Sequence, residues 1–298
     1  MGLTLRASLC AIVVAAGCGR VGFGINGDAT VTDAADDAAT DAPIDALALG
    51  PWSAPQPLTT INALGDVGDP SVTEDRLELF FLTTQGGPGH NIWHATRTQP
   101  TDAWGAPSEV VALNGFIEES PEISSDGLTI YFVSSRGGDF DVYTATRVDR
   151  SSMFSVPVFV PALSSSVIEA NLALSADGLV AVVDRFVSGT DREMFMVRRA
   201  TPADPWGPGL QLTELSTPVT DGMPSLDTHG LTLVFASTRM GDNDLYETQR
   251  ATPADPFAPP QVIGELDAVG VNQNDPFVTA DLRYIVYVID AQLYEASR

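Results

Sequence analysis

Acidic side chains gather at the start of one segment that the chain repeats. In each copy an acid stands one or three residues before the proline position, and the second copy has a further acid two residues before it. The candidate residues are Asp69, Glu118, Glu119, Glu169, Asp221 and Asp275. Carboxylates brought together could bind a cation, a basic peptide or a sugar, or supply an acid and a base. Which chemistry is open to them depends on the fold that positions the copies.

The whole chain is acidic, so acidic loops alone would also explain this pattern. Its 298 residues include 39 Asp and Glu against 15 basic residues, a net charge of −24. Such a chain repels phosphate backbones, which argues against nucleic acid as a partner. There is no lysine for a Schiff base or a P-loop, and no G-x-S-x-G, H-E-x-x-H or glycine-rich phosphate loop. We therefore expect no cofactor and no metal.

The segment belongs to a unit of about fifty residues that recurs five times. Each unit opens with an aromatic residue and a short extended stretch, as in "WSAPQPL" and "WGAPSEVVAL". The loops "RATPADPW" and "RATPADPF" differ only in their last residue. A fixed period in this range is typical of propeller blades. The opening aromatics are Trp52, Trp104, Phe154, Trp206 and Phe257.

The interior of each unit predicts three further strands. A turn signal such as Asp126-Gly127 suits a hairpin that needs a residue with positive φ. The run after it, 128–133, is apolar on both faces, which indicates a strand buried between neighbouring sheets. A third strand follows, with an aromatic near its start and Arg at its end. The next unit's opening stretch makes the fourth strand.

These features predict an all-β, five-bladed propeller of four-stranded antiparallel blades over residues 51–298. The last unit stops at Arg298 after its third strand, and the first begins with a spare outer strand. We expect that strand, 52–58, to complete the last blade and close the ring.

The stretch "SPEISSDGLTIYFVSSRGGDFDVYTATR" resembles the TolB-type, WD-repeat-like β-propellers of bacterial envelopes. The resemblance covers 52–298, although the third unit has Leu172 in place of the proline and Asp184-Arg185 in place of a Ser-Arg loop. It implies a non-catalytic binding or scaffold module, with an envelope protein or a small ligand as its partner at the acidic channel mouth. We expect a monomer.

The alternative is a carbohydrate-active enzyme. Five-bladed propellers include glycosidases with three carboxylates at the channel mouth, and Asp69-Pro70-Ser71 is similar to their first-blade signature. Hydrolysis would need two carboxyl groups roughly 5 to 9.5 Å apart. Asp275-Pro276 repeats the same dipeptide, which favours a structural role for both.

Other polar residues have simpler explanations in this fold. His90 and His94 are too far apart on an extended strand to share one metal ion, so we place one in a loop and the other in a strand. Arg136 and Arg239 could contact a ligand, but we expect them to pair with neighbouring acidic loops. Glu118, Glu119 and Glu122 exceed what the repeat requires, which makes this part of the second unit the place to look for function.

The N-terminus resembles that of an exported lipoprotein. A short apolar stretch ends in "AAGC", similar to a lipobox, although the favoured leucine three residues before the cysteine is Ala15. Residues 1–18 are then a signal peptide with Cys18 as the lipidation site, the alternative being an ordinary cleaved signal peptide. Residues 19–50 are rich in Ala and Asp and predict a disordered tether. We expect contact with the membrane only through this anchor.

Overall fold

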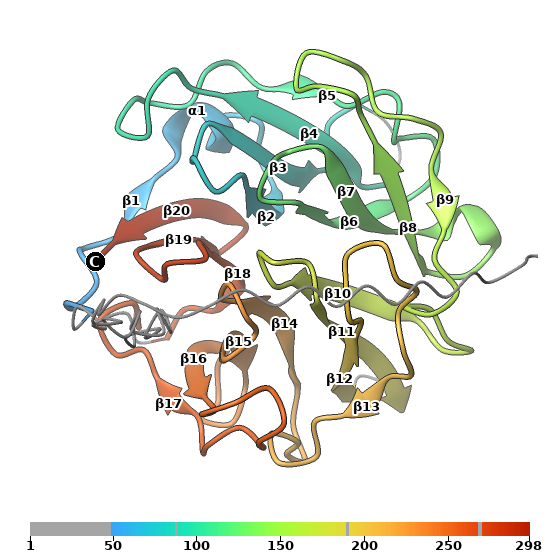
Figure 1. Cartoon of the computed structure of the whole chain (residues 1–298). Helices are drawn as coiled ribbons and strands as arrows, with labels where there is room; N and C mark the ends of the chain where they lie inside the picture. The colour runs from blue at the N-terminus through green and yellow to red at the C-terminus, as the bar shows by residue number, and fades with distance from the viewer. Residues whose placement is uncertain (1–48, 87–88, 189–190, 268–269) are drawn as a thin grey trace, which may run out of the picture. The chain divides into compact units, whose positions relative to one another are not determined.

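The computed structural model describes residues 49–86, 89–188, 191–267 and 270–298. The predicted signal peptide, Cys18 and nearly all of the predicted tether lie outside these residues. Within them, five four-stranded antiparallel sheets are arranged as the blades of a ring, which confirms the five-bladed propeller (Figure 1). No helix among them is long and apolar enough to cross a bilayer.

The blades share one strand order, from the central channel outward. The inner strands are β2 (Val67–Val72), β6 (Glu118–Ile123), β10 (Glu169–Leu174), β14 (Asp221–Leu226) and β18 (Gln273–Val278). The second strands are β3 (Glu78–Thr83), β7 (Thr129–Ser134), β11 (Val180–Ser188), β15 (Thr232–Ser237) and β19 (Tyr284–Ile289). The third strands are β4 (Asn91–Thr96), β8 (Asp141–Thr146), β12 (Asp191–Arg198), β16 (Asp244–Gln249) and β20 (Gln292–Ser297).

Short strands form the rim of the ring. They are β5 (Ser108–Glu109), β9 (Val158–Phe159), β13 (Leu210–Gln211), β17 (Gln261–Val262) and β1 (Gln56–Pro57). The first of them in the chain, β1, pairs with β20, so that Gln56 lies opposite Glu295 and Pro57 opposite Tyr294. The N-terminal strand thus completes the last blade, as expected. A one-turn helix, α1 (Thr59–Asn62), and a 3-10 turn, η1 (Ser135–Gly137), complete the elements of the described residues.

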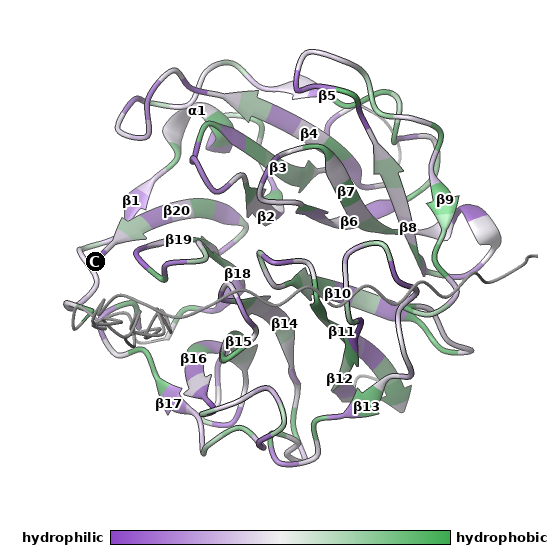
Figure 2. Ribbon diagram, in the orientation of Figure 1, coloured by the Kyte–Doolittle hydropathy of each residue, from purple (hydrophilic) through white to green (hydrophobic). Residues whose placement is uncertain are grey.

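The second strands carry the core, because each is covered on both faces by a neighbouring blade. Every residue of β15 is buried, and β3, β7 and β19 are buried at all but one position. Figure 2 shows hydrophobic residues along strands such as β3 and β7. The doubly apolar pattern was therefore a correct sign of a sandwiched strand.

The turns between first and second strands have the positive φ that the sequence predicts. Gly127 and Gly178 have φ of 75° and 68°. The equivalent positions of the first and last blades hold Arg76 and Leu282, both at φ of 58°. An L-residue is strained there, so the turn itself, rather than the glycine, is the fixed feature of the repeat.

The arginine that ends each third strand joins three parts of its blade. Its guanidinium lies 4.1 to 4.8 Å from the centre of the aromatic ring that opens the outer strand. Its Nε donates to a carbonyl oxygen of the first turn at 2.6 to 2.9 Å. This explains why both residue types recur in every unit. The pairs are Arg97 and Trp104, Arg147 and Phe154, Arg199 and Trp206, Arg250 and Phe257, and Arg298 and Trp52.

Candidate functional site

The residues before the repeat prolines line the channel, each at a bulge in its inner strand. Asp69, Ser120, Met223 and Asp275 have φ between 44° and 57°, which turns their side chains toward the axis. The space that they enclose, together with Asn171, measures about 20 Å³. That volume holds about one water molecule, so a sugar ring does not fit between these side chains as they stand.

Asp69 and Asp275 form a half-buried carboxyl pair in this constriction. Their side chains are hydrogen bonded to each other. Asp69 also accepts hydrogen bonds from the Ser120 backbone N–H at 2.8 Å and from Asn171 Nδ2 at 3.3 Å. Burial raises the pKa of both carboxyls, and the nearby charges of Asp275 and Glu119 raise that of Asp69 further. We therefore expect the pair to keep a shared proton to a higher pH than a free carboxyl group does.

Replacing Asp69 by Asn should reduce the loss of stability with rising pH. The raised pKa values mean that the pair stabilises the fold fully only below the unfolded-state pKa, and that this stability is lost as pH rises through the folded-state values. Asn removes one of the two acids. Urea unfolding at pH 4.5 and pH 8 should show a smaller difference for Asp69→Asn than for the wild type, whereas the exposed Asp66→Asn leaves it unchanged. Equal differences for both variants would contradict the shared proton.

The third blade contributes a hydrogen-bond network around Asp184, a residue that the sequence marked only as a departure from the repeat. Asp184 is fully buried and accepts hydrogen bonds from the backbone N–H groups of Asn171 and Met223, at 2.5 and 2.9 Å. Arg192 donates to Asn171 Oδ1 at 2.9 Å and pairs with Asp184 at 3.3 Å. Burial raises the pKa of Asp184, although the charge of Arg192 opposes the shift. This network joins the third and fourth inner strands.

Three of the predicted carboxylates are paired with arginines inside their own blades. Glu118, Glu169 and Asp221 each begin an inner strand and have little or no exposed surface. Their partners lie at 3.0, 3.1 and 2.5 Å, in the order Arg136, Arg185 and Arg239. The same arginines donate to backbone carbonyls of the loop that enters the blade. The expected pairing of Arg136 and Arg239 is confirmed.

Glu119 lies in the inner strand β6, at the edge of the channel mouth. Among the other predicted carboxylates, it alone is partly exposed and close to Asp69 and Asp275. Its carboxylate lies 2.6 Å from His90 Nδ1, in the loop before β4. His94 lies within β4 and contacts Glu78 instead, at 3.2 Å. The described residues contain no group of three or more His, Cys, Asp or Glu side chains placed to hold a metal. Ligand binding by the six carboxylates stays a prediction.

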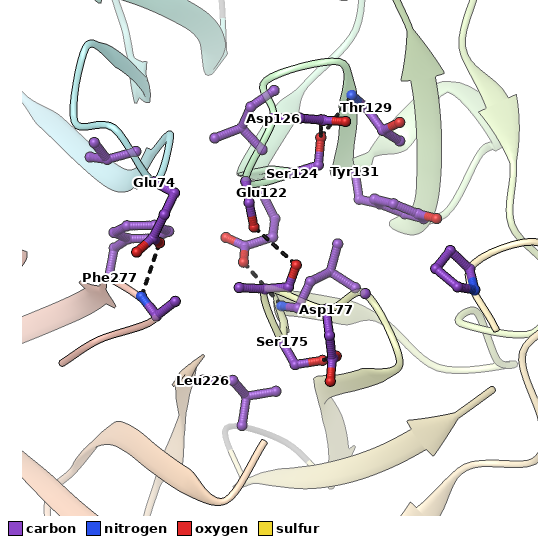
Figure 3. A pocket seen from close by; sticks show the side chains of 18 of the residues that line it. Glu74, Glu122, Ser124, Asp126, Thr129, Tyr131, Ser175, Asp177, Leu226 and Phe277 are labelled. Atoms are coloured by element: carbon purple, nitrogen blue, oxygen red, sulfur yellow. Dashed lines mark hydrogen bonds between the residues drawn. The ribbon is translucent and has the colours of Figure 1, made fainter. Parts of the chain in front are cut away.

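A much larger pocket opens at the other end of the inner strands, beside the turns that follow them (Figure 3). Its volume is about 540 Å³, within the range of small-molecule sites. The ends of the inner strands form an apolar floor, which includes Val72, Ile123, Leu226 and Phe277. From there the pocket extends between the second blade, at Tyr131, and the third.

Glu122 lies where this pocket meets the small channel cavity and lines both. Its carboxyl accepts hydrogen bonds from Ser71 Oγ at 3.1 Å and from the Leu174 backbone N–H at 3.0 Å. Burial raises the pKa of Glu122 to about 8, so the carboxyl is mostly protonated at pH 7. In the fourth blade the equivalent residue is Ser225, and its Oγ accepts a hydrogen bond from the Val278 N–H of the next inner strand at 2.9 Å. A serine is thus enough to bridge neighbouring inner strands. The acid therefore exceeds the structural need, as its place in the repeat suggested.

Comparisons with known proteins identify the fold and leave the family open. No family model matches the chain, and no curated protein does. Among solved structures, a thermostable family-43 glycoside hydrolase has a TM-score of 0.55 at 12% identity, covering 77% of this chain and 88% of that chain. The endo-arabinase from Bacteroides thetaiotaomicron has a TM-score of 0.53 at 13% identity, with coverages of 78% and 93%.

A protein described as TolB from Agrobacterium tumefaciens is also similar in structure. Its TM-score is 0.50 at 13% identity, covering 75% of this chain and 69% of that chain. Glycoside hydrolases and a TolB thus share this architecture with the chain. At such low identity the likeness concerns the fold alone, and function has to be argued from the site.

Proposed function

We propose that this protein is a non-catalytic binding propeller of the bacterial cell envelope, and that its ligand occupies the pocket at the ends of the inner strands. The observation that carries the proposal is the contrast between the two ends of the channel. One end is filled by paired side chains around about 20 Å³, and the other opens into about 540 Å³. A pocket of this size, with an apolar floor and polar side chains around it, suits the capture of a small ligand or a short protein segment.

The second candidate is a glycoside hydrolase acting at the channel mouth. The structural similarity to a family-43 glycoside hydrolase and the raised pKa of Asp69 favour this candidate. The geometry favours it less, because carboxyls hydrogen bonded to each other leave no room for a glycosidic bond between them. Glu118, Glu169 and Asp221 would each have to leave an arginine partner before taking part.

Two assays separate the candidates. Nitrophenyl arabinofuranosides and xylosides should release no nitrophenol above the blank, and turnover abolished by Asp69→Asn would favour the hydrolase instead. Affinity enrichment from an extract of the source cell envelope should retain a ligand on the wild type and on the exposed control Ala254→Trp. The half-buried Ala176→Trp, at the pocket rim, should lose that ligand. Equal retention by both variants would contradict the pocket.

We also propose that Cys18 carries the lipid that holds the protein in the envelope. The support is the "AAGC" sequence after a short apolar stretch. Cys18→Ser should move the protein from the membrane fraction to the soluble fraction, because it removes the thiol that the proposed lipid modifies. Unchanged partitioning of Cys18→Ser would contradict lipidation, with Cys10→Ser as the matched control.

A further inference from the structure

One arginine in the ring lacks the partners that its four equivalents have. All five use Nε to bond a turn carbonyl, but the terminal nitrogens of Arg97, Arg147 and Arg298 also reach carboxylates. Those of Arg250 bond the Gly230 carbonyl oxygen and the sulfur of Met196. In the described part of the chain, the terminal nitrogens of Arg199 have no hydrogen-bond or ion-pair partner. Arg199 lines the large pocket and is only partly exposed.

The missing partner follows from one position of the repeat. In the fourth and fifth blades, the fourth residue of the third strand is a glutamate that pairs with the next blade's arginine: Glu247 with Arg298 and Glu295 with Arg97. The same position of the second blade is Thr144, which is short and uncharged. The space that a carboxylate fills elsewhere is therefore part of the pocket here, and Thr144 lines it.

Other side chains that line the pocket have hydrogen-bonding groups free to contact a ligand. Among the described residues, the side-chain hydroxyls of Thr129, Tyr131 and Thr146 have no hydrogen-bond partner, and all three line the pocket. With Arg199 they offer a cation and hydroxyl donors to an acceptor. A carboxylate matches a guanidinium in charge and in planar two-point geometry.

The acidic rim limits the charge that the pocket accepts. Glu74, Asp126 and Asp177 line the same pocket. Burial tends to raise the pKa of Asp177, but hydrogen bonds from Ser175 and His229 outweigh it and lower that pKa. A single arginine beside these three acids suits one negative charge better than two. The apolar floor at Ile123 and Leu226 in turn suits a hydrocarbon body.

Resting on the proposed function, we infer that the pocket binds an amphipathic monocarboxylate, with its carboxylate on Arg199 and its apolar body over the ends of the inner strands. The ligand's carboxylate takes the place that Glu247 and Glu295 occupy in other blades. The repeat thus supplies both the Arg199 guanidinium and, through Thr144 in place of a glutamate, the space beside it.

Calorimetry with octanoate tests this inference, with 1-octanol as the uncharged match and octyl phosphate as the dianionic one. Octanoate should bind the wild type at least tenfold more tightly than either. Thr144→Glu supplies the carboxylate of the other blades and should weaken octanoate about tenfold to a hundredfold. Thr144→Val removes the hydroxyl without adding charge and should weaken octanoate far less than Thr144→Glu does.

A second pair of variants separates binding from folding. Arg199→Gln and Arg250→Gln both remove a turn contact and an aromatic stack, but only Arg199→Gln should lose octanoate. Absence of octanoate binding to the wild type, equal binding of octanol, tighter binding of octyl phosphate, or full affinity in Thr144→Glu would each overturn the inference. If envelope ligands still depended on Ala176 in those cases, the proposed function would stand and only the ligand class would fall.

Discussion

Replacing Glu122 by Gln should stabilise the protein relative to the wild type as the pH rises. The difference between their free energies of unfolding should grow by about 4 kcal/mol in favour of Glu122→Gln between pH 4.5 and pH 8.5. Glu122 is buried and its pKa is raised from 4.5 to about 8 by that burial. A tenfold change in the acid's ionisation constant corresponds to about 1.4 kcal/mol. Glutamine keeps an oxygen for the Leu174 N–H and a donor for Ser71, without an acid to ionise.

The direction follows from the two pKa values. Below the unfolded-state pKa near 4.5 the acid is neutral in both states, and the stability linked to it is fully present. Between pH 4.5 and 8 the unfolded chain loses this proton while the folded protein keeps it, so the wild type loses stability as the pH rises. The loss levels off above the folded-state pKa. Glu122→Gln lacks this component of the pH profile.

Urea unfolding followed by tryptophan fluorescence at pH 4.5, 6.5 and 8.5 measures the difference. The exposed Glu265→Gln is the matched control, and its stability should follow that of the wild type at all three values. A difference between wild type and Glu122→Gln that stays constant with pH would show that Glu122 is not held neutral in the channel.

Removing the Trp52 side chain should destabilise the protein by about 3 to 5 kcal/mol. Trp52 stands just before the strand that closes the ring, and it is buried in a cluster with Ile285 and Tyr287 of the last blade. The Arg298 guanidinium lies 4.3 Å from its ring centre. Strand β1 is only two residues long, so side-chain burial carries most of the closure.

The measurement is the free energy of unfolding in urea for Trp52→Ala. Gln56→Ala, an exposed change within β1, should cost less than about 1 kcal/mol. A cost for Trp52→Ala as small as that of the control would mean that the ring does not depend on its N-terminal strand.

The fold was predictable because the repeat makes one pattern visible five times. Doubly apolar runs, turn glycines and the spare strand at the N-terminus each had one structural solution, and Trp52 and Arg298 mark the two ends that meet. The predicted signal peptide and tether are different, because they lie outside the described residues. Their predictions rest on composition and on the sequence around Cys18 alone.

The candidate site was harder to predict, because strand position does not show a side chain's partner. Glu118, Glu169 and Asp221 start inner strands, but each is bound to an arginine 16 to 18 residues later. A signal was present in the repeat: the first and last blades have Val67 and Gln273 at this position. Those two blades also lack the later arginine.

The large pocket could not be inferred from sequence, since its volume depends on how neighbouring side chains fill the space between blades. The change from glutamate to Thr144 at one repeat position becomes meaningful only when Glu247 and Glu295 are seen bound to the next blade. Glu122 was visible as a surplus acid, whereas its neutral state required the observed burial.

Site-specific photocrosslinking in the source cell tests most directly whether the pocket, rather than the channel mouth, is the binding site. A benzophenone amino acid is placed at Ala176, on the pocket rim, or at Glu119, on the rim of the mouth, and adducts are identified by mass spectrometry. The proposed function predicts a reproducible adduct from position 176 and none above background from position 119. Adducts at position 119 alone, or at neither position, would contradict it.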